Sequence, residues 1–172
     1  MAAPLFAAVA TDTGWFRFGS AKAGTYRIAA NLIDAGAKPA EIYGSLYEQD
    51  TLGRVKLRGT ILARVATELG GRLAHTYVLK EDFGNTGAVP SDTEDVINMA
   101  LGIAGTEFAV ILVEQQSGGF KISFRSRSGV DCSRLAEQYG GGGHKAAAGA
   151  FLAGPLAEVQ PRILDAVRAA MR

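Results

Sequence analysis

The stretch FAVILVEQQSGGFKISFRSR, residues 108–127, contains two strand patterns joined by a turn. Residues 108–113 form an uninterrupted apolar run, which is typical of a strand buried on both faces. Residues 117–119, Ser-Gly-Gly, are turn formers, and residues 120–127 largely alternate between apolar and polar side chains. Together they predict a β-hairpin.

The second strand of this hairpin carries a set of cations. Successive side chains of a strand point to opposite faces, so the polar residues of 120–127 share one face, away from Phe120, Ile122 and Phe124. A solvated outer face of an antiparallel sheet is one interpretation, because such alternation is common. A binding face for an anion is the other. The polar residues are Lys121, Ser123, Arg125 and Arg127.

The stretch GGGGHKAAAG, residues 140–149, follows the hairpin after one short predicted helix. Glycines allow successive N–H groups to converge into an anion-binding nest. If residues 146–148 begin a helix turn, its positive dipole end points to the same place. His144 can donate to a phosphate oxygen and Lys145 can add charge. A flexible hairpin or linker is the alternative, but the small residues that follow favour a phosphate-binding loop.

The N-terminal part offers one further candidate. Residues 5–10 are a short apolar run followed by Thr-Asp-Thr-Gly, which is typical of a buried parallel strand that ends at a ligand-facing loop. The pattern places Asp12 at the carboxyl end of that strand. A turn or cap residue is the alternative interpretation of a single aspartate in this position.

The remaining periodicities indicate an α/β protein. Residues 51–69 carry an apolar stripe that predicts a long amphipathic helix. After Gly70 and Gly71, residues 73–79 resemble a strand, and a second domain is expected to begin here. Helices are predicted from Ser91, with a capping-box glutamate at Glu94, and from Pro155 to the C-terminus.

Composition restricts the function classes. The chain has 172 residues, 48% hydrophobic, and a formal net charge of +1. This charge argues against a protein that coats long nucleic acids by bulk electrostatics. The single cysteine, Cys132, excludes an internal disulfide, and no apolar run approaches the ~20 residues of a membrane span. A cytoplasmic location is therefore expected.

Three segments carry a resemblance to a known family. TDTGWFRF at 11–18, SFRSRSGVDCSRLA at 123–136 and GGGGHKAAAG at 140–149 resemble the DHH phosphoesterase superfamily. Within it, the chain looks like the bacterial oligoribonucleases that also dephosphorylate 3′-phosphoadenosine 5′-phosphate. The resemblance implies that residues 1–48 are the end of a parallel-sheet DHH domain, 49–70 a connecting helix, and 71–172 a small mixed-sheet α/β substrate-binding domain.

The resemblance also implies an activity and site residues. Such enzymes are hydrolases that cleave short RNAs and small nucleotides, usually with two Mn²⁺ ions, in a cleft between the two domains. Asp12 matches their last metal-binding aspartate. The residues that match the substrate-gripping positions, with the charge of the neighbouring lysine added, are Arg125, Ser126, Arg127, Gly141, Gly142, Gly143, His144 and Lys145.

One part of the family pattern does not occur in this chain. The Asp-x-Asp and Asp-His-His motifs that precede the TDTG segment are absent. A single carboxylate cannot hold two ions that clamp both the attacking and leaving oxygens of a phosphate. The chain therefore looks like the C-terminal half of such an enzyme, and by itself it is expected to be inactive.

Partners and alternatives follow from the same resemblance. A short RNA or a small nucleotide is the expected ligand, and no membrane is expected. A homodimer could form through a sheet edge exposed in residues 1–48. A non-catalytic nucleotide-binding module and a single-strand DNA exonuclease of the same superfamily are the alternative functions.

Overall fold

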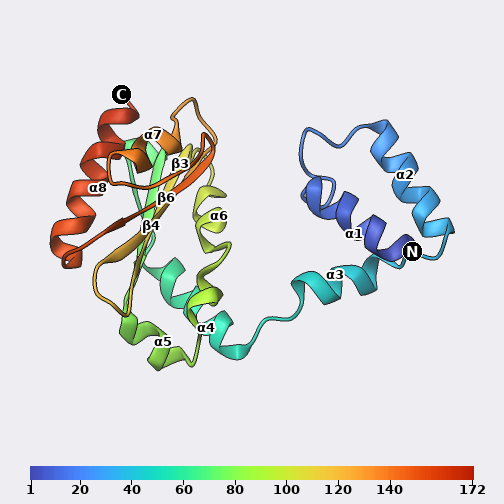
Figure 1. Ribbon diagram of the computed structural model, residues 1–172, viewed down its shortest axis with the longest axis horizontal. Helices are drawn as coiled ribbons and strands as arrows, with labels where there is room; N and C mark the ends of the chain where they lie inside the picture. Colours follow the sequence, from blue (N-terminus) through green and yellow to red (C-terminus); the bar gives the residue numbers. More distant parts are fainter. The chain divides into compact units, whose positions relative to one another are not determined.

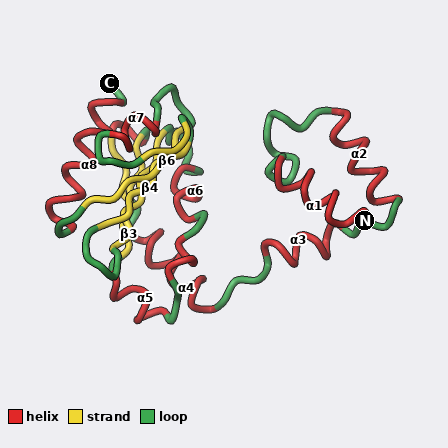
Figure 2. Tube along the Cα trace, in the orientation of Figure 1, coloured by secondary structure: helices red, strands yellow, loops and turns green.

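A computed structural model describes residues 1–172, which divide into two compact units, Met1–Asp50 and Thr51–Arg172 (Figure 1). The first unit consists of helices and loops, and all strands lie in the second unit (Figure 2). None of the helices combines the length and the apolar character that a membrane crossing requires.

The first unit contains three helices, α1 (Ala2–Asp12), α2 (Ala23–Asp34) and α3 (Pro39–Tyr47). The strand predicted over residues 5–10 is wrong, because these residues lie within α1. The segment is rich in alanine, the strongest helix former, and Phe6 and Ala10 are four residues apart, so that both are buried on one side of the helix. No strand occurs in this unit, so the sheet edge predicted to drive self-association is absent there.

The second unit is built on one six-stranded sheet, in the order β1-β2-β3-β4-β6-β5. The strands β2 and β3 are parallel, and every other neighbouring pair is antiparallel. The mixed α/β fold class is confirmed. The strands are β1 (Ala66–Glu68), β2 (Leu73–Val78), β3 (Phe108–Glu114), β4 (Phe120–Ser126), β5 (Gly142–His144) and β6 (Ala147–Leu152). The helices are α4 (Leu52–Ala63), α5 (Lys80–Thr86), α6 (Val96–Leu101), α7 (Cys132–Glu137) and α8 (Leu156–Ala170), with 3₁₀ turns at Leu69–Gly71 and Pro90–Thr93.

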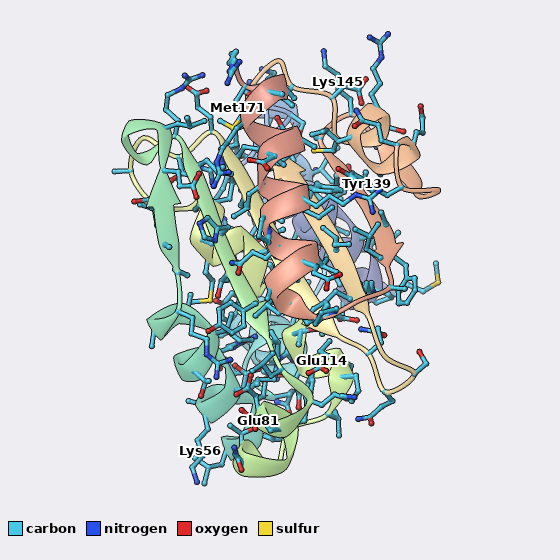
Figure 3. The ribbon with its side chains drawn as sticks, turned by 90° about the vertical axis from the view of Figure 1, so that its left-hand side faces the viewer. Lys56, Glu81, Glu114, Tyr139, Lys145 and Met171 are labelled. Atoms are coloured by element: carbon cyan, nitrogen blue, oxygen red, sulfur yellow. The ribbon has the colours of Figure 1, made fainter.

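Helices cover both faces of this sheet. The helices α7 and α8 pack on one face, and α4, α5 and α6 pack on the other (Figure 1). Figure 3 shows α8 lying across the strands, with Tyr139 beside it. The central strand β3 is buried on both faces, which explains its uninterrupted apolar sequence. The predicted hairpin is confirmed, because β3 pairs with β4 in register from Phe108↔Ser126 to Glu114↔Phe120.

Two predicted helices are shorter than expected. The helix predicted over 51–69 ends at Ala63, and β1 follows because Gly70 and Gly71, with φ of 69° and 92°, let the chain turn back along β2. The helix predicted from Ser91 begins only at Val96, because Asp95 adopts a left-handed conformation with φ of 65°. The C-terminal helix begins after Pro155 as predicted.

A polar cluster fixes α8 to the sheet edge formed by β1 and β2. Glu68 accepts two hydrogen bonds from the Arg168 guanidinium, at 2.6 and 2.8 Å. The largely buried His75 lies with Nε2 3.3 Å from Glu68 Oε1, and Gln160 Nε2 is 3.4 Å from His75 Nδ1. Burial lowers the pKa of His75 below its usual 6.5, although Glu68 opposes this effect.

This cluster predicts that acid destabilises the protein. Because the pKa of His75 is lower in the folded state, the unfolded chain binds more protons once the pH falls below about 6.5. The thermal midpoint should therefore fall by a few degrees between pH 7.5 and 5.5, and His75→Gln should flatten this dependence. The variant His144→Gln is the matched control, because it removes the only other histidine and that side chain is exposed. An unchanged midpoint of the wild type would contradict the prediction.

Candidate functional site

The candidate site lies on the face of the sheet that α6 partly covers. Lys121, Ser123 and Arg125 of β4 all line one cavity there, so the prediction that they share a face is confirmed. Arg127 lies beyond the end of β4, and its amide donates to the Glu107 carbonyl at 2.8 Å. Its exposed side chain is not among those that line the cavity.

The cavity has a volume of about 440 Å³ and is bounded by strands on one side and a loop on the other. This volume falls within the roughly 300–1,000 Å³ of typical small-molecule sites. Strand β4 supplies the cations, β3 supplies an apolar base, and the segment before and within α6 supplies polar groups and two carboxylates. The lining residues are Pro90, Thr93, Glu94, Asp95, Ile97, Ile111, Val113, Gln115, Lys121, Ser123 and Arg125.

The two cations of the cavity have no acidic partner. Lys121 makes no ion pair, and the Arg125 guanidinium donates only to the carbonyl of its neighbour Phe124, at 3.0 Å. Other arginines in this unit, such as Arg64 and Arg168, do pair with carboxylates. A guanidinium with free donors at a cavity is suited to a phosphate or carboxylate, which it can bind with two parallel hydrogen bonds.

The sheet register brings His144 to the same face as Arg125. Arg125 pairs with Ala147 of β6, and Ala147 pairs with His144 of β5. Directly paired residues on neighbouring strands point to the same face, so Arg125 and His144 lie on one side of the sheet, and two strand spacings separate their Cα atoms by about 10 Å. In the same way, Ser123, Gly149 and Gly142 form an adjacent row.

Two other predicted residues lie away from this face. Ser126, which is 9% exposed, pairs with Phe108 and points toward the opposite face of the sheet. Its hydroxyl accepts a hydrogen bond from the Ser128 amide at 3.2 Å, and so shapes the loop after β4. Lys145 is exposed in the turn between β5 and β6, and Figure 3 shows it at the same end of the domain as Met171.

The glycine stretch supplies the edge strand β5, which packs closely against β6. The helix turn predicted at residues 146–148 is wrong, because Ala147–Leu152 form β6. The amides of Gly140 and Gly141 donate to carbonyls of α7 and its end, at 3.1 and 2.9 Å, so they do not form the predicted nest. A Cβ at Gly141 would lie 2.7 Å from Ala150 Cα, and one at Gly143 would lie 2.6 Å from Ala148 Cα. Both glycines are therefore needed for the approach of β5 to β6.

The sequence predicted that Asp12 lies at the end of a strand, and this prediction is wrong. Asp12 is the exposed last residue of α1 in the first unit. No group of three or more His, Cys, Asp or Glu side chains in residues 1–172 could hold a metal ion. The residues of this chain therefore do not by themselves fit the two-ion centre that the sequence resemblance implies.

The sequence missed the acidic wall of the cavity. Glu94 was expected to cap a helix that begins near Ser91, but it lines the cavity together with Asp95. The sequence gives no direct signal for this role, because the spacing of Ser91 and Glu94 is already explained by a helix cap. The left-handed backbone of Asp95, which separates the 3₁₀ turn from α6, positions both residues.

The Cys132 thiol lies on the other face of the sheet, in the core beneath α7 and α8. Cys132 is fully buried, and burial raises its pKa to about 11, although the nearby Arg125 opposes this effect. The thiol therefore stays protonated at neutral pH, and its role is in the core between α7 and the sheet.

The second unit is thus an α/β domain with helices on both faces of a mixed sheet and, on one face, an open cavity lined by two cations and two carboxylates. The family model of the DHHA1 domain matches residues 70–172, and the chain belongs to this family. The chain is 36% identical over 169 residues, 98% of its length, to the bifunctional oligoribonuclease and PAP phosphatase NrnA of Thermus thermophilus.

Two other proteins are similar over most of the chain. It is 31% identical over 148 residues, 86% of its length, to the bifunctional oligoribonuclease and PAP phosphatase NrnA of Bacillus subtilis. The crystal structure of an exopolyphosphatase-related protein from Bacteroides fragilis covers 94% of the chain, with a TM-score of 0.82 and 28% identity, over 46% of its own chain. The chain spans about half the length of its curated relatives, 50% and 46% respectively.

Proposed function

We propose that this chain is the substrate-binding half of a phosphoesterase that hydrolyses short oligoribonucleotides and 3′-phosphoadenosine 5′-phosphate or related nucleotides. The observation that carries the proposal is the pair of cations without acidic partners, Lys121 and Arg125, at a cavity of about 440 Å³ in a DHHA1 domain. The names of the two curated relatives, oligoribonuclease and PAP phosphatase, support the substrate class.

The residues of this chain would bind and orient the substrate. Arg125 would hold a phosphate through two parallel hydrogen bonds, Lys121 would add charge, and His144 would donate from the neighbouring row. Gly141, Gly142 and Gly143 have no side chains that project from the sheet, so the substrate could approach this face at the edge strand. Fixing a phosphodiester in one orientation reduces the entropic part of the barrier to hydrolysis.

Hydrolysis itself requires groups that this chain does not assemble. Bound Mn²⁺ ions would supply an activated water and stabilise charge on the phosphate. Asp12 is the residue that we propose as one ligand, and the others would come from outside the chain. The side chains of the DHHA1 domain act on the position of the substrate and not on the metal.

Replacing Arg125 tests the grip directly. Arg125→Ala should weaken the binding of 3′-phosphoadenosine 5′-phosphate about tenfold or more, because a charge-assisted contact to a phosphate is lost. Isothermal titration calorimetry measures this change. Arg134→Ala is the matched control, because that side chain is 85% exposed on α7, which packs on the other face of the sheet. Unchanged affinity of Arg125→Ala would exclude Arg125 from the site.

Activity is tested with a 5′-labelled RNA trinucleotide and Mn²⁺, together with a binding titration of the same RNA. Binding without cleavage is the expected result for this chain. Cleavage would contradict the proposal that the metal centre needs further ligands, and the absence of binding would overturn the proposed function. Single-stranded DNA in a parallel titration tests the exonuclease alternative, which requires DNA to bind at least as tightly as RNA.

A further inference from the structure

The wall of the cavity opposite β4 is acidic. Glu94 and Asp95 both line the cavity from the segment that connects the 3₁₀ turn at Pro90–Thr93 to α6. One Asp95 oxygen, Oδ1, accepts a hydrogen bond from Asn98 Nδ2 at 3.2 Å, and Oδ2 has no partner. Glu94 makes no side-chain hydrogen bond or ion pair. The cavity therefore presents carboxylate oxygens that are free to accept hydrogen bonds.

The opposite charges across the cavity do not form ion pairs with one another. Neither carboxylate forms an ion pair with Lys121 or Arg125, although all four side chains line the same space. A free anion would satisfy the cations only and would be repelled by the acids. The lining instead suits a molecule that combines phosphate groups with hydrogen-bond donors, as a nucleotide does.

The spacing of the cations indicates which part of a nucleotide meets the acids. Lys121 and Arg125 are four residues apart on one strand, so their Cα atoms are separated by about 13 Å. Ser123 lies between them on the same face. A ribonucleotide with phosphates on both sides of its sugar can reach both cations, and its sugar then lies in the middle of the cavity, between Ser123 and the acidic wall.

Carboxylates are well suited to recognise this sugar. A ribose 2′-hydroxyl donates readily to an aspartate or glutamate oxygen, and this group is what distinguishes RNA from DNA at a binding site. A deoxyribose would leave the carboxylates without that donor. Glu94 and Asp95 are both exposed, so their oxygens are accessible to a sugar hydroxyl from the open side of the cavity.

We propose that Glu94, assisted by Asp95, reads the 2′-hydroxyl and makes this cavity selective for ribonucleotides over deoxyribonucleotides. This inference rests on the proposed function, since it assigns the sugar-reading residues of the same site. Glu94 and Asp95 are specificity residues in this assignment, while Lys121 and Arg125 hold the phosphates.

The test compares 3′-phosphoadenosine 5′-phosphate with its 2′-deoxy analogue by calorimetry on the full chain. The two ligands have the same base and phosphates, so the ratio of their affinities reports the 2′-hydroxyl alone. The wild type should favour the ribonucleotide about tenfold, as expected for a hydrogen bond to a charged group. Glu94→Gln should reduce the ratio to about threefold or less, and Glu94→Gln combined with Asp95→Asn should bring it close to one.

The ratio also separates recognition of the sugar from general electrostatics. If the acids do not contact the sugar, removing a negative charge next to the cations should strengthen the binding of both ligands equally. The ratio of the two affinities would then stay unchanged. Glu158→Gln, an exposed acid at the start of α8 on the other face, is the matched control and should keep the wild-type ratio. Retained affinity for the deoxy ligand shows that each variant is folded.

The outcomes distinguish this inference from the function on which it rests. If the wild type binds both ligands equally, or if the double variant keeps the preference, the sugar-reading role is wrong while the phosphate grip stands. If the wild type binds neither ligand, the proposed function and this inference are both overturned. A preference that disappears only in the Glu94 and Asp95 variants supports the assignment.

Discussion

Asp82→Ala should lower the free energy of unfolding by about 4 kcal/mol, the cost expected when one partner of a buried ion pair is removed. Asp82 is 4% exposed, its Oδ1 accepts from the Arg64 guanidinium at 2.8 Å, and its Oδ2 accepts from the Leu79 amide at 2.7 Å. Burial opposes the ionisation of Asp82, yet these hydrogen bonds keep its pKa below the usual value. Urea unfolding followed by circular dichroism measures the loss.

The large expected effect has two causes. The alanine variant removes the acceptor for the first amide before α5, and it leaves the partly buried Arg64 without its counterion. Glu107→Ala is the matched control in the same unit, because Glu107 pairs with Arg72 at 3.1 Å where both side chains are more than 40% exposed. Its loss should be far smaller. Equal losses for the two variants would show that burial does not determine the contribution of Asp82.

Gly141→Ala should destabilise the second unit by about 3 kcal/mol, because overpacking against backbone atoms cannot be relieved by a side-chain rotation. The added Cβ would lie 2.7 Å from Ala150 Cα and 2.8 Å from Ala150 Cβ. The adjacent Gly142→Ala is the control, since a Cβ there meets no atom within 4 Å and φ is not positive. Thermal unfolding of the two variants, measured in parallel, gives the difference.

The same pair of variants also tests the interpretation of the glycine stretch. If the glycines serve only flexibility, both substitutions should have similar and small effects. If β5 must lie close against β6, only Gly141→Ala should be strongly destabilising, and it should also weaken nucleotide binding by displacing His144. A stable Gly141→Ala protein would contradict the close approach of these two strands.

The predictions from sequence were accurate where local pattern and tertiary environment agree. The apolar run of β3 and the alternation of β4 predicted their hairpin. A strand buried on both faces is apolar throughout, whereas a strand buried on one face alternates between apolar and polar residues. The terminal helix α8 was predicted for the same reason, since its apolar residues recur at helical spacing after Pro155. The resemblance carried by residues 123–136 and 140–149 led to the DHHA1 family, which the family match confirmed.

The errors lie where a short segment has more than one locally acceptable conformation. The short apolar run of residues 5–10 is compatible with a strand or with a helix. It forms a helix whose buried side packs against α2 and α3. Residues 66–68 lie within the predicted helix of 51–69, yet they pair with β2 once Gly70 and Gly71 reverse the chain. Residues 147–149 are small enough for either state, and the free edge of β4 recruits them as β6.

The sequence by itself determined the α/β class, the hairpin of residues 108–127, the shared face of Lys121, Ser123 and Arg125, and the family. The fold class, the hairpin and the shared face depend on periodicity and on residues close together in the chain, which local sterics and burial fix. The family follows instead from the resemblance carried by residues 123–136 and 140–149. Only the tertiary structure decided that His144 lies in the row of Arg125, that Ser126 points away, and that Glu94 and Asp95 form the opposite wall. These positions depend on strand register and on the packing of α6 against the sheet, which join segments that no local pattern connects.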